Sequence, residues 1–125
     1  MSRVRGVNTT PEWTVRRLVF GMGYRYRLHV RKLPGAPDLV FPARRKVIQV
    51  HGCFWHGHDG CRLARVPKSN TAFWAAKMRT NKCRDQANVA KLRTMGWTSF
   101  VVWQCELKNV EDTARRINEF LEDTK

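Results

Sequence analysis

Residues of the types that bind zinc stand close together near the middle of the chain. Cys53, His58 and Cys61 lie within nine residues of a glycine-rich stretch, and Cys105 follows an apolar segment that is typical of a strand. Zinc favours tetrahedral sites of thiolate and imidazole, and a closed set of three cysteines and one histidine is structural. The spacing therefore predicts a structural zinc site, whereas Cys83 is expected to be an ordinary packed or free thiol. The alternative is a group of small buried thiols beside a surface histidine.

Two more histidines in the same stretch could transfer protons. His51 and His56 flank Phe54 and Trp55, and they cannot both join a metal site that already contains His58. Imidazole is the usual proton-transfer group near neutral pH, and a carboxylate behind it would orient the ring. The adjacent aromatic residues could project from the loop as a wedge between DNA base pairs. The alternatives are structural histidines and core packing of at least one aromatic residue.

The charge of the chain is unevenly distributed. Residues 1–105 contain 20 basic and only four acidic residues, a net charge of +16, whereas residues 106–125 have a net charge of −2. A surface this positive repels itself unless an anion neutralises it, and nucleic acid is the expected anion. A solvated basic face, or attraction to anionic lipid, is the alternative.

The few acidic residues of the basic segment are candidates for holding a cation or a proton. Glu12 is expected on the inward edge of a helix, and Asp38 at the start of a strand, where its carboxylate could face a cleft. Asn81 and Asp85 fall on the apolar stripe of a long helix, where core residues would be expected. Salt bridges to the many arginines are the alternative for any one acidic residue. Three acidic residues on inward edges together favour a functional role.

These residues are positioned by a predicted alternation of helices and strands. Thr10-Pro11-Glu12 opens a helix, and Asn109 caps the last helix. A loop is expected over residues 51–70, a long helix over residues 71–95, and strands over residues 24–30, 38–41, 46–50 and 98–103. The pattern predicts a single α/β domain over residues 1–125. All apolar runs are shorter than the ~18 residues of a membrane span, so no membrane partner is expected.

Several motifs carry a resemblance to a known family. They are Thr10-Pro11-Glu12, Leu33-Pro34-Gly35-Ala36-Pro37-Asp38-Leu39-Val40-Phe41, Val50-His51-Gly52-Cys53-Phe54-Trp55-His56-Gly57-His58, Phe73-Trp74, Lys77, Asn81, Arg84-Asp85, and Gly96-Trp97 with Val101-Val102-Trp103-Gln104-Cys105. Over about residues 6–108 the chain resembles the very short patch repair endonucleases of bacteria. Gln104 departs from the family pattern, because a glutamate often precedes the strand-end cysteine.

The resemblance implies a restriction-endonuclease-like α/β fold, in which a central mixed β-sheet is flanked by helices. It implies an endonuclease that nicks one DNA strand 5′ to the thymine of a T:G mismatch left by deamination of 5-methylcytosine. The expected partner is double-stranded DNA that carries this mismatch, with mismatch-repair proteins as further partners. A monomer in the bacterial cytoplasm, associated with the nucleoid when bound to DNA, is expected.

The resemblance also implies catalytic roles. Asp38 would be the main ligand of a catalytic Mg²⁺, with the Val50 carbonyl beside it. Glu12 would hold a water of that ion. His56, oriented by Asp85, would activate the water that attacks the phosphodiester.

Structural zinc and DNA contacts are implied in the same way. The family's zinc ligands are matched by Cys53, His58, Cys61 and Cys105. His51 would lie near the scissile phosphate, and Phe54 and Trp55 match the base-pair wedge. Lys77 and Asn81 are expected to contact phosphate and the mismatch.

Two other functions are compatible with the residues. A non-catalytic, zinc-containing DNA-binding module would act by charge and shape alone. A restriction-like nuclease of different or broader mismatch or damage specificity would keep the fold and change the substrate. The endonuclease is favoured because phosphodiester hydrolysis needs a neutralised phosphate, an activated water and a stabilised leaving oxygen. A magnesium ion that is held by carboxylates supplies the neutralised phosphate and the stabilised leaving oxygen. A His–Asp pair supplies the activated water.

Overall fold

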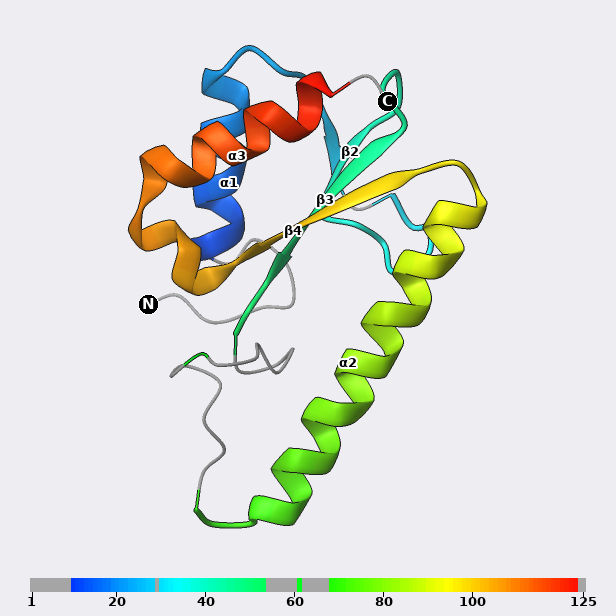
Figure 1. Ribbon diagram of the computed structural model, residues 1–125, viewed down its shortest axis with the longest axis vertical. Coiled ribbons are helices and arrows are strands. Elements are labelled where there is room, and N and C mark those ends of the chain that lie inside the picture. The colour runs from blue at the N-terminus through cyan, green and yellow to red at the C-terminus, as the bar shows by residue number, and fades with distance from the viewer. Residues whose placement is uncertain (1–9, 29, 54–60, 62–67, 124–125) are drawn as a thin grey trace.

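The computed structural model describes residues 10–28, 30–53, 61 and 68–123 (Figure 1). A four-stranded sheet stands at the centre, with the strand order β1-β2-β3-β4, and helices cover both of its faces. The expected mixed sheet flanked by helices is therefore confirmed. None of the described helices is long and apolar enough to cross a membrane.

The central strands form the frame of the sheet. β3 (Lys46–His51) pairs antiparallel with β2 (Leu39–Phe41), which pairs antiparallel with β1 (Arg27–Leu28). β3 pairs parallel with β4 (Thr98–Trp103), and such a pair needs a long crossover connection. This crossover contains α2 (Thr71–Thr94). Because β3 and β4 are parallel, their carboxyl ends meet at one edge of the sheet.

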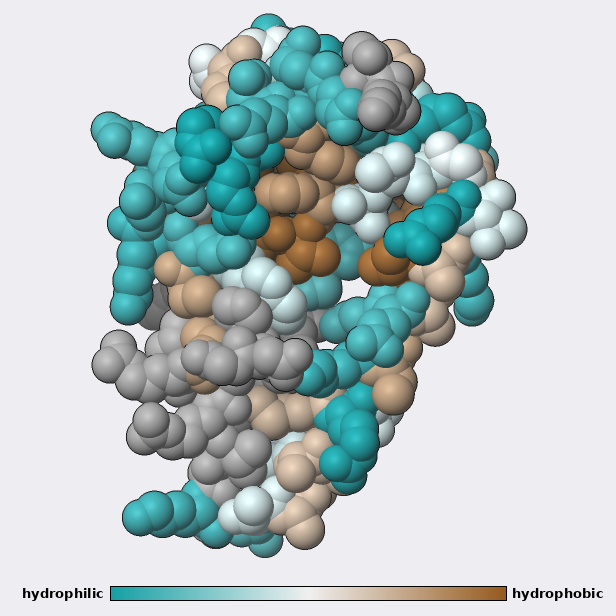
Figure 2. All heavy atoms as spheres, viewed as in Figure 1, coloured by the Kyte–Doolittle hydropathy of each residue, from teal (hydrophilic) through white to brown (hydrophobic). Residues whose placement is uncertain are grey.

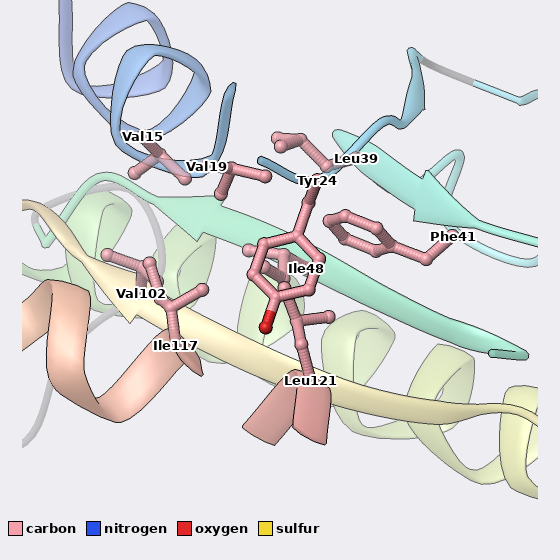
Figure 3. Packing of buried hydrophobic residues seen from close by; sticks show 9 residues of the cluster. All are labelled: Val15, Val19, Tyr24, Leu39, Phe41, Ile48, Val102, Ile117 and Leu121. Atoms are coloured by element: carbon pink, nitrogen blue, oxygen red, sulfur yellow. The ribbon is translucent and has the colours of Figure 1, made fainter. Parts of the chain in front are cut away.

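α1 (Thr10–Gly21) and α3 (Val110–Glu122) pack on one face of the sheet. α3 begins as predicted, because the side chain of Asn109 accepts a hydrogen bond from the N–H of Asp112 at 3.0 Å. α1 begins at Thr10, one residue before the predicted first helical position. Figure 3 shows how the two helices and the sheet form the larger buried apolar cluster: Val15, Val19, Tyr24, Leu39, Phe41, Ile48, Val102, Ile117 and Leu121.

α2 packs on the other face and is exposed over much of its length. A smaller apolar cluster joins the C-terminal part of this helix to the sheet: Leu33, Val40, Val47 and Leu92. In Figure 1 the N-terminal part of α2 extends well beyond the sheet. Figure 2 shows hydrophilic side chains, in teal, along this helix.

Part of the excess positive charge holds the helices in place. At the end of α3, Arg44 Nε donates to Leu121 O at 3.0 Å and Lys46 Nζ donates to Phe120 O at 2.5 Å. On the other side of the sheet, Arg45 Nη2 donates at 2.7 Å to the carbonyl of Met95, which ends α2. Cations stabilise the carbonyl ends of helices. These three bases therefore serve the fold.

Two features differ from the elements predicted from sequence. The strand predicted over residues 24–30 is reduced to the two residues of β1, because β2 is itself only three residues long and offers few pairing partners. Tyr24 instead enters the larger cluster, and its hydroxyl donates to Asn118 Oδ1 at 2.9 Å. A 3-10 helix, η2 (Gln104–Lys108), follows β4 without having been predicted.

Candidate active site and metal centre

Three of the four predicted zinc ligands meet beyond the ends of β3 and β4. Cys53 follows β3, Cys105 lies in η2, and Cys61 joins them, so that the three sulfur atoms lie within 4.8 Å of one another. Sulfurs around a tetrahedral zinc ion stand about 3.8 Å apart, because each Zn–S bond is about 2.3 Å long. This cysteine cluster therefore fits a metal ion that prefers thiolates. His58, the fourth predicted ligand, lies outside the described residues.

Hydrogen bonds hold the cysteine cluster together. The N–H of Cys105 donates to Cys53 Sγ, and the N–H of Cys53 donates to Gln104 Oε1, both at 3.4 Å. Glu106 fixes the start of η2, because its Oε1 accepts a hydrogen bond from the N–H of Trp103 at 2.9 Å. Gln104, the residue that departs from the family pattern, therefore supports the loop that carries Cys53. Sequence reasoning did not identify this role.

The thiols of the cluster are difficult to ionise by themselves. Burial raises the pKa of Cys53 to about 12; the N–H of Cys105 opposes this rise, and the neighbouring thiols add to it. Burial also raises the pKa of Cys105. A cation bound among the sulfurs would reverse this preference, because it stabilises the thiolates directly. Metal binding to this cluster would therefore release protons.

Asp38 lies against the C-terminal part of β3. Its Oδ2 accepts a hydrogen bond from the backbone N–H of Val50 at 2.7 Å, and its side chain is half-buried just before β2. The contact brings the two residues predicted to hold magnesium next to each other. A carboxylate and a backbone carbonyl are the oxygen ligands that magnesium prefers, so this pair fits the ion.

His51, the last residue of β3, is held from two directions. Its Nε2 lies 3.1 Å from Gln49 Oε1, and its ring packs edge-on against Trp103, with the ring centroids 5.1 Å apart. Both His51 and Gln49 are 6% exposed. Gln49 is a polar residue that sequence reasoning missed. The available signal was a glutamine in the middle of an otherwise apolar central strand.

Glu12 is buried in the first turn of α1 and is paired within its own helix. Its Oε2 lies 2.6 Å from Arg16 Nη2, and the Arg16 guanidinium also stacks over the ring of Trp13. The salt bridge that the sequence left open as an alternative is therefore present. α1 contacts β3 and η2, and Figure 1 shows its first turn, in dark blue, beside η2. Glu12 thus stands at the end of the molecule that also carries the cysteine cluster.

The polar stripe predicted on the long helix is confirmed by burial. Asn81 is 8% exposed, and its Oδ1 accepts a hydrogen bond from Arg84 Nη2 at 2.8 Å. Asp85 is half-buried one turn later, and Lys77 is exposed one turn earlier. These three positions therefore offer an amide, a carboxylate and a cation along one stretch of α2.

The other predicted site residues, Phe54, Trp55 and His56, lie outside the described residues. The described part of the chain brings several predicted site residues to the carboxyl end of β3, where Val50 and His51 end the strand and Cys53 follows it. Asp38 contacts Val50. Ligands of α/β proteins commonly bind at the carboxyl ends of parallel strands. This edge of the sheet can hold a cation through oxygen atoms and present an imidazole beside it, which is chemistry suited to a phosphodiester.

Comparison with known proteins agrees with this geometry. The family described as DNA mismatch endonuclease Vsr matches residues 1–62. A type II nicking enzyme of Xanthomonas oryzae, V.XorIIP, is 50% identical over 122 residues, which cover 98% of this chain and 89% of that protein. The DNA mismatch endonuclease Vsr of Escherichia coli is 38% identical over 117 residues, covering 93% and 74% of the two chains. The chain therefore belongs to the Vsr family of DNA mismatch endonucleases.

Proposed function

We propose that this protein nicks one strand of double-stranded DNA 5′ to the thymine of a T:G mismatch, in a reaction that depends on magnesium. The observation that carries the proposal is the contact between Asp38 and Val50, at the carboxyl end of β3 and three residues before Cys53, the first residue of the cysteine cluster. The Asp38 carboxylate accepts a hydrogen bond from the N–H of Val50, the residue whose carbonyl is the second proposed ligand. In a segment with so few acidic residues, a carboxylate at this position is suited to binding a divalent cation. The chain acts as one restriction-endonuclease-like domain and as a monomer.

Asp38 and the Val50 carbonyl would hold the catalytic ion. When bound there, magnesium neutralises charge on the phosphate and stabilises the leaving oxygen. Glu12 holds a water beside the ion, and Arg16 fixes the direction of the Glu12 carboxylate through their contact of 2.6 Å.

The attacking water is activated by His56, which Asp85 orients from α2. A carboxylate behind an imidazole fixes the position of the ring and favours its protonated form as the proton is taken up. His51 contributes a second imidazole near the scissile phosphate. Its burial and its packing on Trp103 support a fixed position for this ring.

Selectivity for the mismatch comes from the aromatic pair and from α2. Phe54 and Trp55 enter the base stack, which costs a few kcal/mol per step and least at a mispair, because its pairing is already weak. Lys77 and Asn81 contact phosphate and the mispair. The hydrogen bond from Arg84 to Asn81 supports this role, since it holds the amide in one orientation.

Nicking assays on labelled duplexes test the proposed reaction. We expect cleavage of a T:G duplex in the presence of Mg²⁺, and little cleavage of a fully paired duplex or of the T:G duplex with EDTA. A U:G duplex reports how broadly the enzyme accepts mispairs. Equal cleavage of mismatched and paired DNA would favour the broader nuclease, and binding without cleavage would favour the non-catalytic module.

We further propose that Cys53, His58, Cys61 and Cys105 bind one structural zinc ion. Because the binding free energy of a structural zinc ion contributes directly to folding, its removal is expected to lower the melting temperature sharply. Elemental analysis should find about one zinc per chain. In the Cys105→Ser variant the zinc content should fall, whereas Cys83→Ser, which changes an exposed cysteine away from the cluster, is the matched control. Full zinc content in Cys105→Ser would contradict the ligand set.

A further inference from the structure

Gln49 is a polar residue buried in a central strand, a position that costs free energy of folding unless the amide is hydrogen-bonded, and it contacts His51. Both side chains are 6% exposed, and as alternate residues of β3 they lie on the same face of the sheet. A buried amide destabilises the fold unless its polar atoms are hydrogen-bonded. Here Gln49 Oε1 lies 3.1 Å from His51 Nε2. The strand thus contains a polar residue whose oxygen is directed at an imidazole.

The imidazole is also fixed from the neighbouring strand. The register of β3 and β4 places His51 beside Trp103, and the two ring planes are inclined at 79°. The position of the histidine ring is therefore restrained by a hydrogen bond to Gln49 in its own strand and by aromatic packing against Trp103 in the neighbouring strand. Together the two contacts leave the ring little freedom to rotate.

Gln49 also links this imidazole to the proposed metal ligands. The residue after it, Val50, donates its backbone N–H to Asp38 at 2.7 Å. A shift of the backbone at Gln49 would therefore disturb both the contact with His51 and the N–H that Val50 donates to Asp38.

We propose that Gln49 is a positioning residue that fixes the orientation and the tautomer of His51. An amide oxygen only accepts hydrogen bonds, so the contact requires a proton on Nε2 and leaves Nδ1 as the basic nitrogen of the neutral ring. This inference rests on the proposed function, in which His51 lies near the scissile phosphate. Gln49 then acts on nicking through His51 and makes no contact with DNA.

Two measurements on the full-length protein test the proposal. The first is the ¹⁵N spectrum of the imidazole nitrogens at one pH at which the ring is neutral, with the His51 signals assigned by their loss in His51→Gln. The second is single-turnover nicking of the T:G duplex, together with the Kd for that duplex. In Gln49→Met, which keeps the length of the side chain and removes the acceptor, we expect a mixture of tautomers. The nicking rate should fall at least about tenfold, as expected for the loss of an oriented catalytic-site group, with Kd unchanged.

Matched variants separate positioning from general destabilisation. Val47→Ala removes apolar volume from the same strand and the same face without touching the imidazole contact; it should lower the melting temperature and leave the tautomer unchanged. Gln49→Glu retains an acceptor and should retain the Nε2–H tautomer. If Gln49→Met fails to fold, Gln49→Val, whose side chain suits a central strand, provides the same test.

The outcomes are distinct. An unchanged tautomer in the acceptor-free variant, or a changed tautomer with an unchanged nicking rate, would overturn the proposal. If the wild-type protein fails to nick the T:G duplex, the proposed function is wrong, and the tautomer measurement then decides by itself whether Gln49 sets the state of His51.

Discussion

The two faces of the sheet are packed by different means. The face covered by α1 and α3 buries a cluster of nine apolar residues, whereas the α2 face buries a cluster of four. Both faces also bury polar residues: Gln49 and His51 lie on the same face of β3 as Val47, and Glu12 and Arg16 lie in α1. Polar groups cost free energy when they are removed from water, so each buried pair is compensated by its own contact, Gln49 with His51 and Glu12 with Arg16. The comparison indicates that the two faces differ in the size of their apolar clusters, whereas both of them bury polar residues of the proposed site.

The largest effect is expected for Asp38→Ala, which should abolish activity and spare the main core. We expect nicking of the T:G duplex to fall by at least about a thousandfold, because several kcal/mol of charge stabilisation depend on the ion that this carboxylate holds. Thermal unfolding should change little, since Asp38 is outside both apolar clusters. Retained nicking would show that the proposed ligand is wrong, and Asp112→Ala, at a carboxylate on α3, is the control.

The second-largest effect is a loss of stability, expected when the ion pair buried in α1 loses its arginine. Arg16→Ala leaves the Glu12 carboxylate, which is 3% exposed, without its guanidinium partner, and should lower the free energy of unfolding by about 3–5 kcal/mol. Arg115, whose ion pair with Glu119 is exposed, provides the matched comparison, and Arg115→Ala should lower the free energy of unfolding far less than Arg16→Ala. Urea unfolding measures both values. Similar losses in the two variants would argue against a tightly buried pair.

A smaller difference in the free energy of unfolding is expected between two valine variants, one on each face of the sheet. Val102 belongs to the larger cluster and Val47 to the smaller one, and both are fully buried. Val102→Ala should lower the free energy of unfolding by about 2 kcal/mol, and Val47→Ala by about 1 kcal/mol, because the smaller cluster can relax more easily around the lost methyl groups. If the order is reversed in urea unfolding, the assignment of the main core to the α1–α3 face is wrong.

The smallest effect is a dependence of stability on pH at the end of α3. The hydroxyl of Tyr24, followed by the charges of Arg44 and Lys46, lowers the pKa of Glu122. A lowered pKa in the folded state contributes stability above the unfolded-state pKa of the carboxyl group, and this contribution is lost as pH falls through the folded-state pKa. Glu122→Gln should therefore be less stable than the wild type near pH 7. The two proteins should become alike in acid, as followed by urea unfolding at a series of pH values.

Much of the site was predictable because zinc ligands and helix caps leave local signals. The sequence predicted that Cys53, Cys61 and Cys105 would converge, and the structure brings them together. Asn81 was predicted on a buried stripe and is buried. The roles of the magnesium and zinc ligands stay predictions, as do those of Phe54, Trp55, His56 and His58.

Other features left no local signal. The caps that Arg44, Arg45 and Lys46 place on two helices join residues at least 50 positions apart, so no window of sequence contains both partners. The shortening of β1 depends on the length of β2, and the contact of Gln49 with His51 depends on which face of the strand each residue takes.

The sequence by itself determined the kinds of groups available to this protein: scarce carboxylates, thiols and imidazoles within a strongly basic chain, together with the helix starts that caps specify. Only the tertiary structure decided which of these groups meet, because strand pairing brings Asp38 to Val50, and parallel alignment of β3 with β4 brings Cys53 to Cys105. Composition fixes charge and chemistry locally, whereas distances between residues far apart in the chain are set by packing.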